Sequence, residues 1–456
     1  MNTIILSAIF GVVMMFSGIF IENKSAYRHI AAIALLLLLG FNIAESRGYS
    51  IFHINAQYFL HFEKFGLLFN SVCIFSTLIY VLLSGRDIEK VGKNVAESFA
   101  LIFFVLCGVG IVTSYTNLLM LFIGIEIISI PLYILTGSEK RNLKGNEASL
   151  KYFLMGSFST GIMLMGIAML YGSGGSFLVE KLQGAGLSYL EALGMLLIFF
   201  ALSFKVSVAP FHFWTPDVYD GAPTVFTSFM ATVVKVAGFA AFIRLFESRY
   251  GSMGGQTEHL IALAIILTLA FGNLTAVFQQ SVKRMLAYSS IAQAGFMMFA
   301  LFAVNDTAKE GLLLYAAAYS LATIGIFAVL AKMDDMTFEG FNGLAKSQPL
   351  IAALVAIFLL SLAGIPLTAG FFAKYYMLSA IVKTGSYLGL VIIGVLFAAI
   401  SAYYYFKVIQ AMYFKDGQDV AFAPVTSTFK YLLLGVAIVI VVLGIYPNAL
   451  LSLLYF

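Results

Sequence analysis

The sequence contains few charged residues, and this scarcity excludes a soluble protein. Charged residues make up 11% of the 456 residues and hydrophobic residues 61%, whereas soluble domains contain roughly 25% and 45–50%. The net charge of +4 is small and spread over short loops, so it does not indicate a nucleic-acid partner. We therefore interpret the chain as an integral membrane protein without a soluble catalytic domain.

The sequence also lacks the patterns that hold metals, clusters and nucleotides. Its two cysteines, Cys73 and Cys107, lie in separate apolar runs without a CxxC arrangement, which disfavours an iron–sulfur or zinc site. The five histidines form no HExxH motif, and neither a GxGxxG motif nor a P-loop occurs. We expect this chain to bind no cofactor, so any redox or nucleotide chemistry coupled to it would take place elsewhere.

The sequence does contain many long apolar runs. Runs of about 20 apolar residues predict membrane-spanning helices. No basic segment precedes the first run and no clear cleavage site follows it, so we interpret it as an uncleaved helix. The sequence predicts an all-α, polytopic membrane protein with about 14 transmembrane helices, at 3–21, 27–44, 66–84, 97–114, 117–136, 149–171, 192–213, 222–247, 259–279, 285–304, 309–331, 350–379, 386–413 and 430–453.

Lysine and arginine in the loops predict the orientation. The loops after odd-numbered spans hold more of these residues than the other loops do, among them Arg86, Lys90, Lys140, Arg141 and Lys144. Loops rich in these residues stay on the cytoplasmic side of a membrane. We therefore expect both termini to face the non-cytoplasmic side.

Five ionisable side chains lie well inside the predicted spans. A charge at the centre of a spanning helix costs about 2.5–3.5 kcal/mol on insertion scales, so a chain that keeps several normally uses them to move ions or protons. A buried lysine suits proton relay, because both its ammonium and its amine form are accessible. These residues are Glu126, Lys151, Lys205, Lys235 and Lys374.

Two predicted spans carry the signals of a broken helix. In the seventh, Lys205 precedes Pro210; in the twelfth, Gly364 and Pro366 precede Lys374. Such breaks are tolerated at membrane depth only where the freed backbone faces protein or water. The odd number of spans between them indicates inverted repeats. We predict N-terminal flanking helices over 1–95, a first five-helix unit over 96–250, an inverted second unit over 251–415 and a C-terminal helix over 416–456.

Several segments carry a family resemblance that extends from about residue 95 to 415. These segments are Gly124–Tyr133, Glu147–Phe153, Phe204–Thr224, Lys235–Phe239 and Lys283–Ile291. Together they resemble the antiporter-like membrane subunits of respiratory complex I. The resemblance implies a fourteen-span fold with broken helices.

The resemblance also implies a function. The chain would be a proton-translocating subunit of NADH-quinone oxidoreductase in the bacterial cytoplasmic (inner) membrane. NADH and quinone would react on partner subunits, and the partners would be other membrane-arm subunits, including further antiporter-like ones. Two alternatives stay open. A subunit of a multi-subunit sodium/proton antiporter shares most of the buried charges, whereas a structural spacer would not need unpaired charge at mid-membrane.

The resemblance assigns roles to the buried charges. Glu126 would modulate Lys205, because pairing keeps both residues charged and separation lets the lysine release its proton. Lys235 would be a central connector and Lys374 a terminal relay. The alternative for Glu126 is a hydrogen bond to a buried polar neighbour, and for the two lysines it is packing with a snorkelling ammonium.

Lys151 and His212 are candidates of second rank. Lys151 lies near the cytoplasmic end of its span, so it either supports the carboxylate–lysine pair or extends its ammonium to the interface. His212 lies at the helix break, where it either admits protons or caps the broken helix. We expect Asp217 and Asp220, in the same stretch, to be solvated or to cap a helix.

Gln293 departs from the family pattern, in which histidine is common at this position. Glutamine can orient water but cannot carry a proton. We therefore expect the second half of the chain to keep a carrier lysine, Lys374, without the charged modulator that Glu126 provides in the first half.

Overall fold

The protein is all-helical throughout the residues that the computed structural model describes, which are 1–182, 188–249, 255–385, 387–417 and 422–455. The elements are α1 (Asn2–Phe20), α2 (Lys24–Ser46), α3 (Lys64–Ile88), α4 (Val95–Val112), α5 (Leu118–Thr136), α6 (Leu143–Gly174), η1 (Val179–Leu182), α7 (Tyr189–Val206), α8 (Trp214–Gly221), α9 (Thr224–Phe229), η2 (Met230–Val234), α10 (Lys235–Arg249), α11 (Gly255–Val277), α12 (Val282–Ala303), α13 (Asp306–Leu330), η4 (Glu339–Phe341), α14 (Leu344–Ser347), α15 (Pro349–Ala363), α16 (Ala369–Val382), α17 (Leu388–Phe414), α18 (Ser427–Ile445), α19 (Asn448–Leu451) and η5 (Ser452–Leu454).

The helices are long and apolar enough to cross a membrane many times. Thirteen stretches in the described residues qualify, with α9, η2 and α10 forming one of them. The shorter apolar helices α15 and α16 follow one another and together form one further crossing. The prediction of an all-α, polytopic protein with about 14 spans is therefore confirmed.

Three predicted spans differ clearly from the structure in their ends or regularity. The seventh ends at Val206 rather than at residue 213, because Ser207 adopts a left-handed conformation (φ 66°) and closes the helix. The eighth is interrupted by the π-helical turn η2. In addition, α6 extends from Leu143 to Gly174 and so exceeds its predicted span at both ends.

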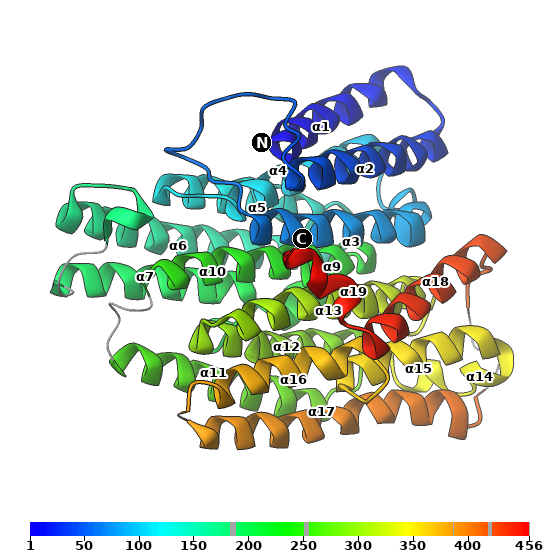
Figure 1. The fold of residues 1–456 in the computed structure, drawn as a ribbon. Helices are drawn as coiled ribbons and strands as arrows, with labels where there is room; N and C mark the ends of the chain where they lie inside the picture. The colour runs from blue at the N-terminus through cyan, green and yellow to red at the C-terminus, as the bar shows by residue number, and fades with distance from the viewer. Residues whose placement is uncertain (183–187, 250–254, 386, 418–421, 456) are drawn as a thin grey trace.

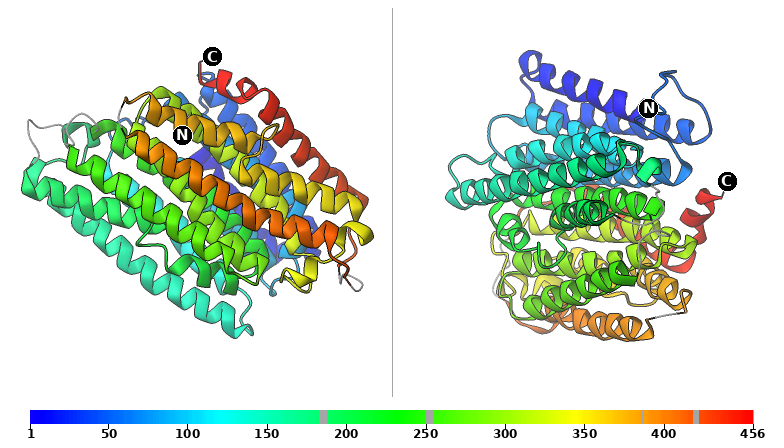
Figure 2. Two further views of the ribbon diagram at one scale, coloured as in Figure 1. Left: turned by 90° about the horizontal axis from the view of Figure 1, so that it is seen from below. Right: turned by 90° about the vertical axis from the view of Figure 1, so that its left-hand side faces the viewer.

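The helices lie side by side in an array that roughly follows the chain order (Figure 1). Helices α1 and α2 lie at one end of the array and α17 at the other, as the right-hand view of Figure 2 also shows. Helix α13 is fully buried along its most apolar window and contacts α3, α9, α15, α16 and α18. Helix α18 returns across the array to reach α3 and α13. The predicted domain boundary at 250/251 lies outside the described residues, and the division into two units stays a prediction.

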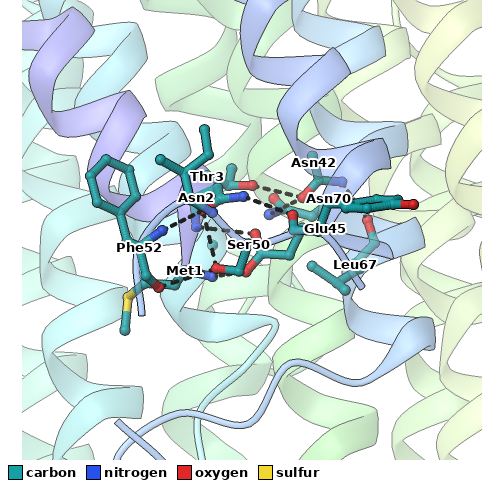
Figure 3. A network of polar contacts seen from close by, with 12 residues as sticks. Met1, Asn2, Thr3, Asn42, Glu45, Ser50, Phe52, Leu67 and Asn70 are labelled. Atoms are coloured by element: carbon teal, nitrogen blue, oxygen red, sulfur yellow. Dashed lines mark hydrogen bonds and ion pairs between the residues drawn. The ribbon is translucent and has the colours of Figure 1, made fainter. Parts of the chain in front are cut away.

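A polar network joins the first three helices (Figure 3). Thr3 Oγ1 on α1 donates to Asn42 Oδ1 on α2 at 2.7 Å. The Asn42 amide donates to the Leu67 carbonyl at 2.8 Å and to Ser71 Oγ at 2.7 Å, both on α3. One buried asparagine thus fixes the mutual register of three apolar helices, which apolar packing alone specifies poorly.

A buried ion pair joins α3 to the end of α13. Lys332 follows α13, and its ammonium donates to both carboxylate oxygens of Asp87, at 2.6 Å for Oδ1. The side chains are 9% and 6% exposed. The Phe429 ring of α18 lies 5.4 Å from the ammonium. Because removing one partner of a buried pair leaves an uncompensated charge, this contact locks the flanking helices onto α13.

Candidate functional site

Lys205 is buried at the end of the first half of a broken helix. It lies in the last turn of α7 and is 6% exposed. Its ammonium donates to Ser129 Oγ on α5 at 2.7 Å and lies 5.8 Å from the centre of the Tyr152 ring. Its hydrogen-bonding partner in the described part of the chain is therefore neutral.

Glu126 lies close to Lys205 without pairing with it. It is half-buried on α5, on the same helix face as Ser129 because the two are three residues apart. The carboxylate of Glu126 interacts electrostatically with the ammonium of Lys205, but no ion pair joins them among the described residues. The ammonium donates its hydrogen bond to Ser129 instead. The carboxylate and the ammonium are thus not in contact in this structure, and the switch between them stays a prediction.

Lys235 begins α10 directly after a π-helical turn. It is 1% exposed, and its ammonium donates to the carbonyl of Ser290 at 2.9 Å and to the hydroxyl of the same residue. The turn redirects the backbone N–H of Lys235 to the Thr232 carbonyl. This frees the carbonyl of Ala231, which accepts a hydrogen bond from Tyr319 at 2.8 Å instead. Single π-turns inside helices are frequent at functional sites.

Ser290 on α12 is the point where several of these groups meet. Besides Lys235, Tyr219 and Tyr319 also lie near Ser290, although no hydrogen bond joins either hydroxyl to it among the described residues. The ring centre of Tyr219 is also 5.9 Å from the Lys235 ammonium. A serine hydroxyl both donates and accepts, so Ser290 can link the lysine to either tyrosine.

Aromatic rings fill the space between Lys205 and Lys235. Tyr152, below Lys205, is stacked on Trp214 with ring centres 4.6 Å apart and planes at 8°. Trp214 meets Tyr219 edge to face at 5.9 Å. Packed aromatic rings therefore separate the two lysines, and two of these rings, Tyr152 and Tyr219, carry hydroxyls.

Lys374 lies in the first turns of α16, after the second helix break. It is 6% exposed; its ammonium donates to the carbonyl of Ala363 at 2.8 Å and to Ser401 Oγ at 3.4 Å. Ala363 is the last residue of α15, so the ammonium lies at the negative end of that helix. Gly364 follows with φ 85°, and a Cβ there would lie 2.8 Å from Lys374 Cδ, so the position requires glycine.

Gln293 lies between the Lys235–Ser290 contact and Lys374. Its amide nitrogen donates to the Leu362 carbonyl and to the Tyr405 hydroxyl, both at 3.0 Å. Its amide oxygen accepts from Tyr315. A cavity of about 10 Å³ is lined by Gln293, Tyr319 and Lys374, among others. This is about the space of a single water molecule, and a water needs two to four polar partners, which these side chains supply.

Lys151 forms two ion pairs at a partly exposed position. Its ammonium binds Glu147 at 2.8 Å and Asp217 at 3.1 Å, and its side chain is 42% exposed. Among the described residues no hydrogen bond or ion pair joins it to Glu126 or Lys205, and both of its expected roles stay predictions. Asp217, which we expect to be solvated or to cap a helix, is 41% exposed in the first turn of α8 and also binds Arg284 at 3.0 Å. Folding brings Lys151 of α6 and Arg284 of α12 to Asp217.

His212 lies at the first break and is 4% exposed. Its ring is stacked between Phe213 and Phe271, with ring centres 4.6 and 5.4 Å away. Its carbonyl accepts the N–H of Thr215 at the start of α8. Within the described residues its Nδ1 is buried without a partner. The backbone role in closing the break is thus visible, and proton entry stays a prediction.

Several polar residues of this region were missed by the sequence reasoning, namely Ser129, Ser290, Tyr315 and Tyr319. Tyr315 and Tyr319 were detectable, because two tyrosines four residues apart mark one polar face on an otherwise apolar helix. The serines carry no such signal, since small residues are common at helix contacts in membranes. Across the residues with a described placement, no three His, Cys, Asp or Glu side chains gather as a metal site.

Comparison with known proteins identifies the family. Residues 116–401 match the NADH:quinone oxidoreductase/Mrp antiporter transmembrane family. The chain is 40% identical to NADH-quinone oxidoreductase subunit N of Cytophaga hutchinsonii over 99% of each chain. It is 36% identical to the same subunit of Flavobacterium psychrophilum over 100% of each.

Solved structures show the same fold. A chain of respiratory complex I from Thermus thermophilus is 31% identical, with a TM-score of 0.86 over 99% of this chain and 98% of that one. A chain of the Mrp complex from Dietzia sp. reaches a TM-score of 0.83 over 100% and 96%, but at 18% identity it shows the fold alone. The whole-length relatives distinguish the two branches: the chain belongs to the NADH-quinone oxidoreductase subunit N family.

Proposed function

We propose that this chain carries protons along a line of buried lysines, from Lys205 through Lys235 to Lys374. As a member of the subunit N family it is a proton-translocating, membrane-arm subunit of complex I. The observation that supports this route is that each of the three buried ammonium groups bonds only to hydroxyl or carbonyl oxygens in the described part of the chain.

Neutral partners suit a proton carrier. A carboxylate in contact would hold a lysine in its charged form, whereas hydroxyls and carbonyls stabilise the charge without neutralising it. A buried lysine with such partners can exchange its proton with a neighbour. The nearby hydroxyls of Ser129, Ser290 and Tyr319 can donate and accept within the same step.

The order of the line follows from the contacts. Glu126 and Lys205 form the modulated entry, since Glu126 acts on Lys205 electrostatically while Ser129 holds its ammonium. Ser290 bonds to Lys235 and lies near Tyr319, and Tyr319 and Lys374 both line the water-sized cavity. Lys151 and His212 have second-rank roles near the first break.

The energy for transport would come from other subunits of complex I. Electron transfer from NADH to quinone would take place there, and conformational change would move Glu126 relative to Lys205. This chain would bind neither substrate. It would lie in the bacterial cytoplasmic (inner) membrane with both termini on the non-cytoplasmic side, beside other membrane-arm subunits, including further antiporter-like ones.

Substitution of the central lysine tests the route. The whole complex carrying Lys235→Met is reconstituted in proteoliposomes, and the protons taken up per NADH oxidised are measured. We expect this ratio to fall sharply while native gels show full assembly. Lys140→Met, in an exposed loop position, is the matched control and should keep the wild-type ratio. A wild-type ratio in the assembled Lys235→Met complex would rule out the route.

A further inference from the structure

An apolar groove outside the lysine line opens between the flanking helices. Its volume is about 540 Å³, and its walls come from α2, α3, α13, α18 and the α19–η5 segment. Apolar side chains predominate, among them Leu39, Leu68, Phe75, Leu321 and Leu443. Helices from both ends of the chain thus meet here around an unfilled space.

Two cations lie at one end of this groove. Arg47 is the residue that ends α2 and Lys64 is the first residue of α3, so both lie on the same side of the helix array. Both line the groove. In the described structure neither side chain has a hydrogen bond or an ion pair. An apolar groove with cations at one end has the polarity of a phospholipid.

The neighbouring acids do not neutralise these cations, because they are engaged elsewhere. Glu45 accepts hydrogen bonds from the backbone N–H of Asn2 at 3.0 Å and from the amino group of Met1 (Figure 3). Glu63 pairs with Arg244 at 3.5 Å. Arg47 and Lys64 therefore keep their charge available for an external anion.

We propose that the groove binds one anionic phospholipid, with an acyl chain along the apolar walls and the phosphate between Arg47 and Lys64. Basic residues at the ends of transmembrane helices attract anionic lipid head groups. A polypeptide helix would fill the apolar part but would leave both cations unmatched, which disfavours it. The lipid would join α2 and α3 to α18 by filling the space between them.

The lipid content of the complex tests this site. Complexes with Arg47→Ala and Lys64→Ala combined, purified in detergent, are extracted and their anionic phospholipid is quantified by mass spectrometry. We expect the loss of one bound anionic lipid per complex, which vesicles of phosphatidylglycerol fail to restore. Lys181→Ala, an exposed lysine of the loop after α6, is the control and should retain it.

A photo-crosslinker identifies the occupant independently. Benzoylphenylalanine replaces Phe75, which lines the groove, so that its added benzoyl group enters the groove, and the complex is irradiated in membranes. An adduct with the mass of a phospholipid supports the proposal. An adduct with a polypeptide, the absence of a lipid adduct, or unchanged lipid content in the double variant would each overturn it. Proton pumping is not the readout, so the proposal stands or falls apart from the proton route.

Discussion

The two broken helices close in the same way but hold their lysines differently. Helix α7 is closed by Ser207 (φ 66°) and α15 by Gly364 (φ 85°), each the residue directly after the helix. In each case the next residue, Val208 or Ile365, donates its N–H to the carbonyl five residues earlier, at 2.8 and 3.0 Å. The left-handed residue with this backward hydrogen bond is the Schellman termination. A shared backbone device therefore serves both halves of the chain.

The lysines lie on opposite sides of these breaks. Lys205 precedes its break and reaches across to Ser129 on another helix, near Glu126. Lys374 follows its break and reaches back to Ala363 at the end of its own broken helix. The ammonium of Lys205 thus contacts a separate helix, whereas that of Lys374 contacts the end of the helix that precedes its own. This contrast supports our proposal that the first half controls proton transfer and the second half conducts.

The largest effect is expected at Lys205. Arginine at this position keeps the positive charge but cannot release its proton. We therefore expect Lys205→Arg, like Lys205→Ala, to lose nearly all proton pumping in the assembled complex, measured as protons per NADH in proteoliposomes. Lys140→Arg, in an exposed loop, should leave the ratio unchanged. Pumping at the wild-type level in Lys205→Arg would mean that charge alone, without proton transfer, is required there.

A smaller but still sharp loss of proton pumping is expected when the carboxylate of the first half is replaced by the amide of the second half. Glu126→Gln replaces the carboxylate by the amide that the second half has at Gln293. Without its charge the electrostatic control of Lys205 is lost, although the lysine itself remains. We expect pumping per NADH to fall several-fold, but less than in Lys205→Arg. The exposed Glu139→Gln is the control, and equal ratios in the two variants would remove the modulator role of Glu126.

Local sequence signals predicted most of this fold. Hydropathy gave the crossings, and Pro210, Gly364 and Pro366 marked the breaks, because proline and glycine act on the backbone where they stand. The π-turn before Lys235 has no such marker. It contains neither proline nor glycine, and its freed carbonyl is satisfied by Tyr319 from a helix far along the chain.

The environment of each charged side chain was harder to predict, because it also depends on residues far along the chain. Lys151 and Lys205 are both lysines within apolar runs, yet one binds Asp217 at an exposed edge and the other is buried beside Ser129. Helix packing decides between these outcomes, and packing depends on contacts between residues tens of positions apart. The candidate lysines could thus be named from the sequence, but their partners could not.

A partial loss of proton pumping is expected for Tyr319, at the connection between the two halves. Tyr319→Phe removes the hydroxyl that satisfies the carbonyl freed by the π-turn and that faces the cavity beside Lys374. An unsatisfied buried carbonyl costs about 1–3 kcal/mol, so we expect a lower thermal midpoint as well as reduced pumping. Tyr403→Phe, exposed on α17, should change neither. Unchanged pumping with a lowered midpoint would restrict Tyr319 to a structural role.

The smallest effect is expected at Gln293, because an amide orients water but carries no proton. Gln293→Ala removes three hydrogen bonds, yet it also enlarges the cavity beside Lys374. Additional water can then bond to the hydroxyls of Tyr315 and Tyr405 and to the Leu362 carbonyl. We expect a slight fall in protons per NADH. An unchanged ratio would deny Gln293 a water-ordering role, whereas a loss as large as that of Lys205→Arg would show that the second half depends on a modulator after all, one that is neutral.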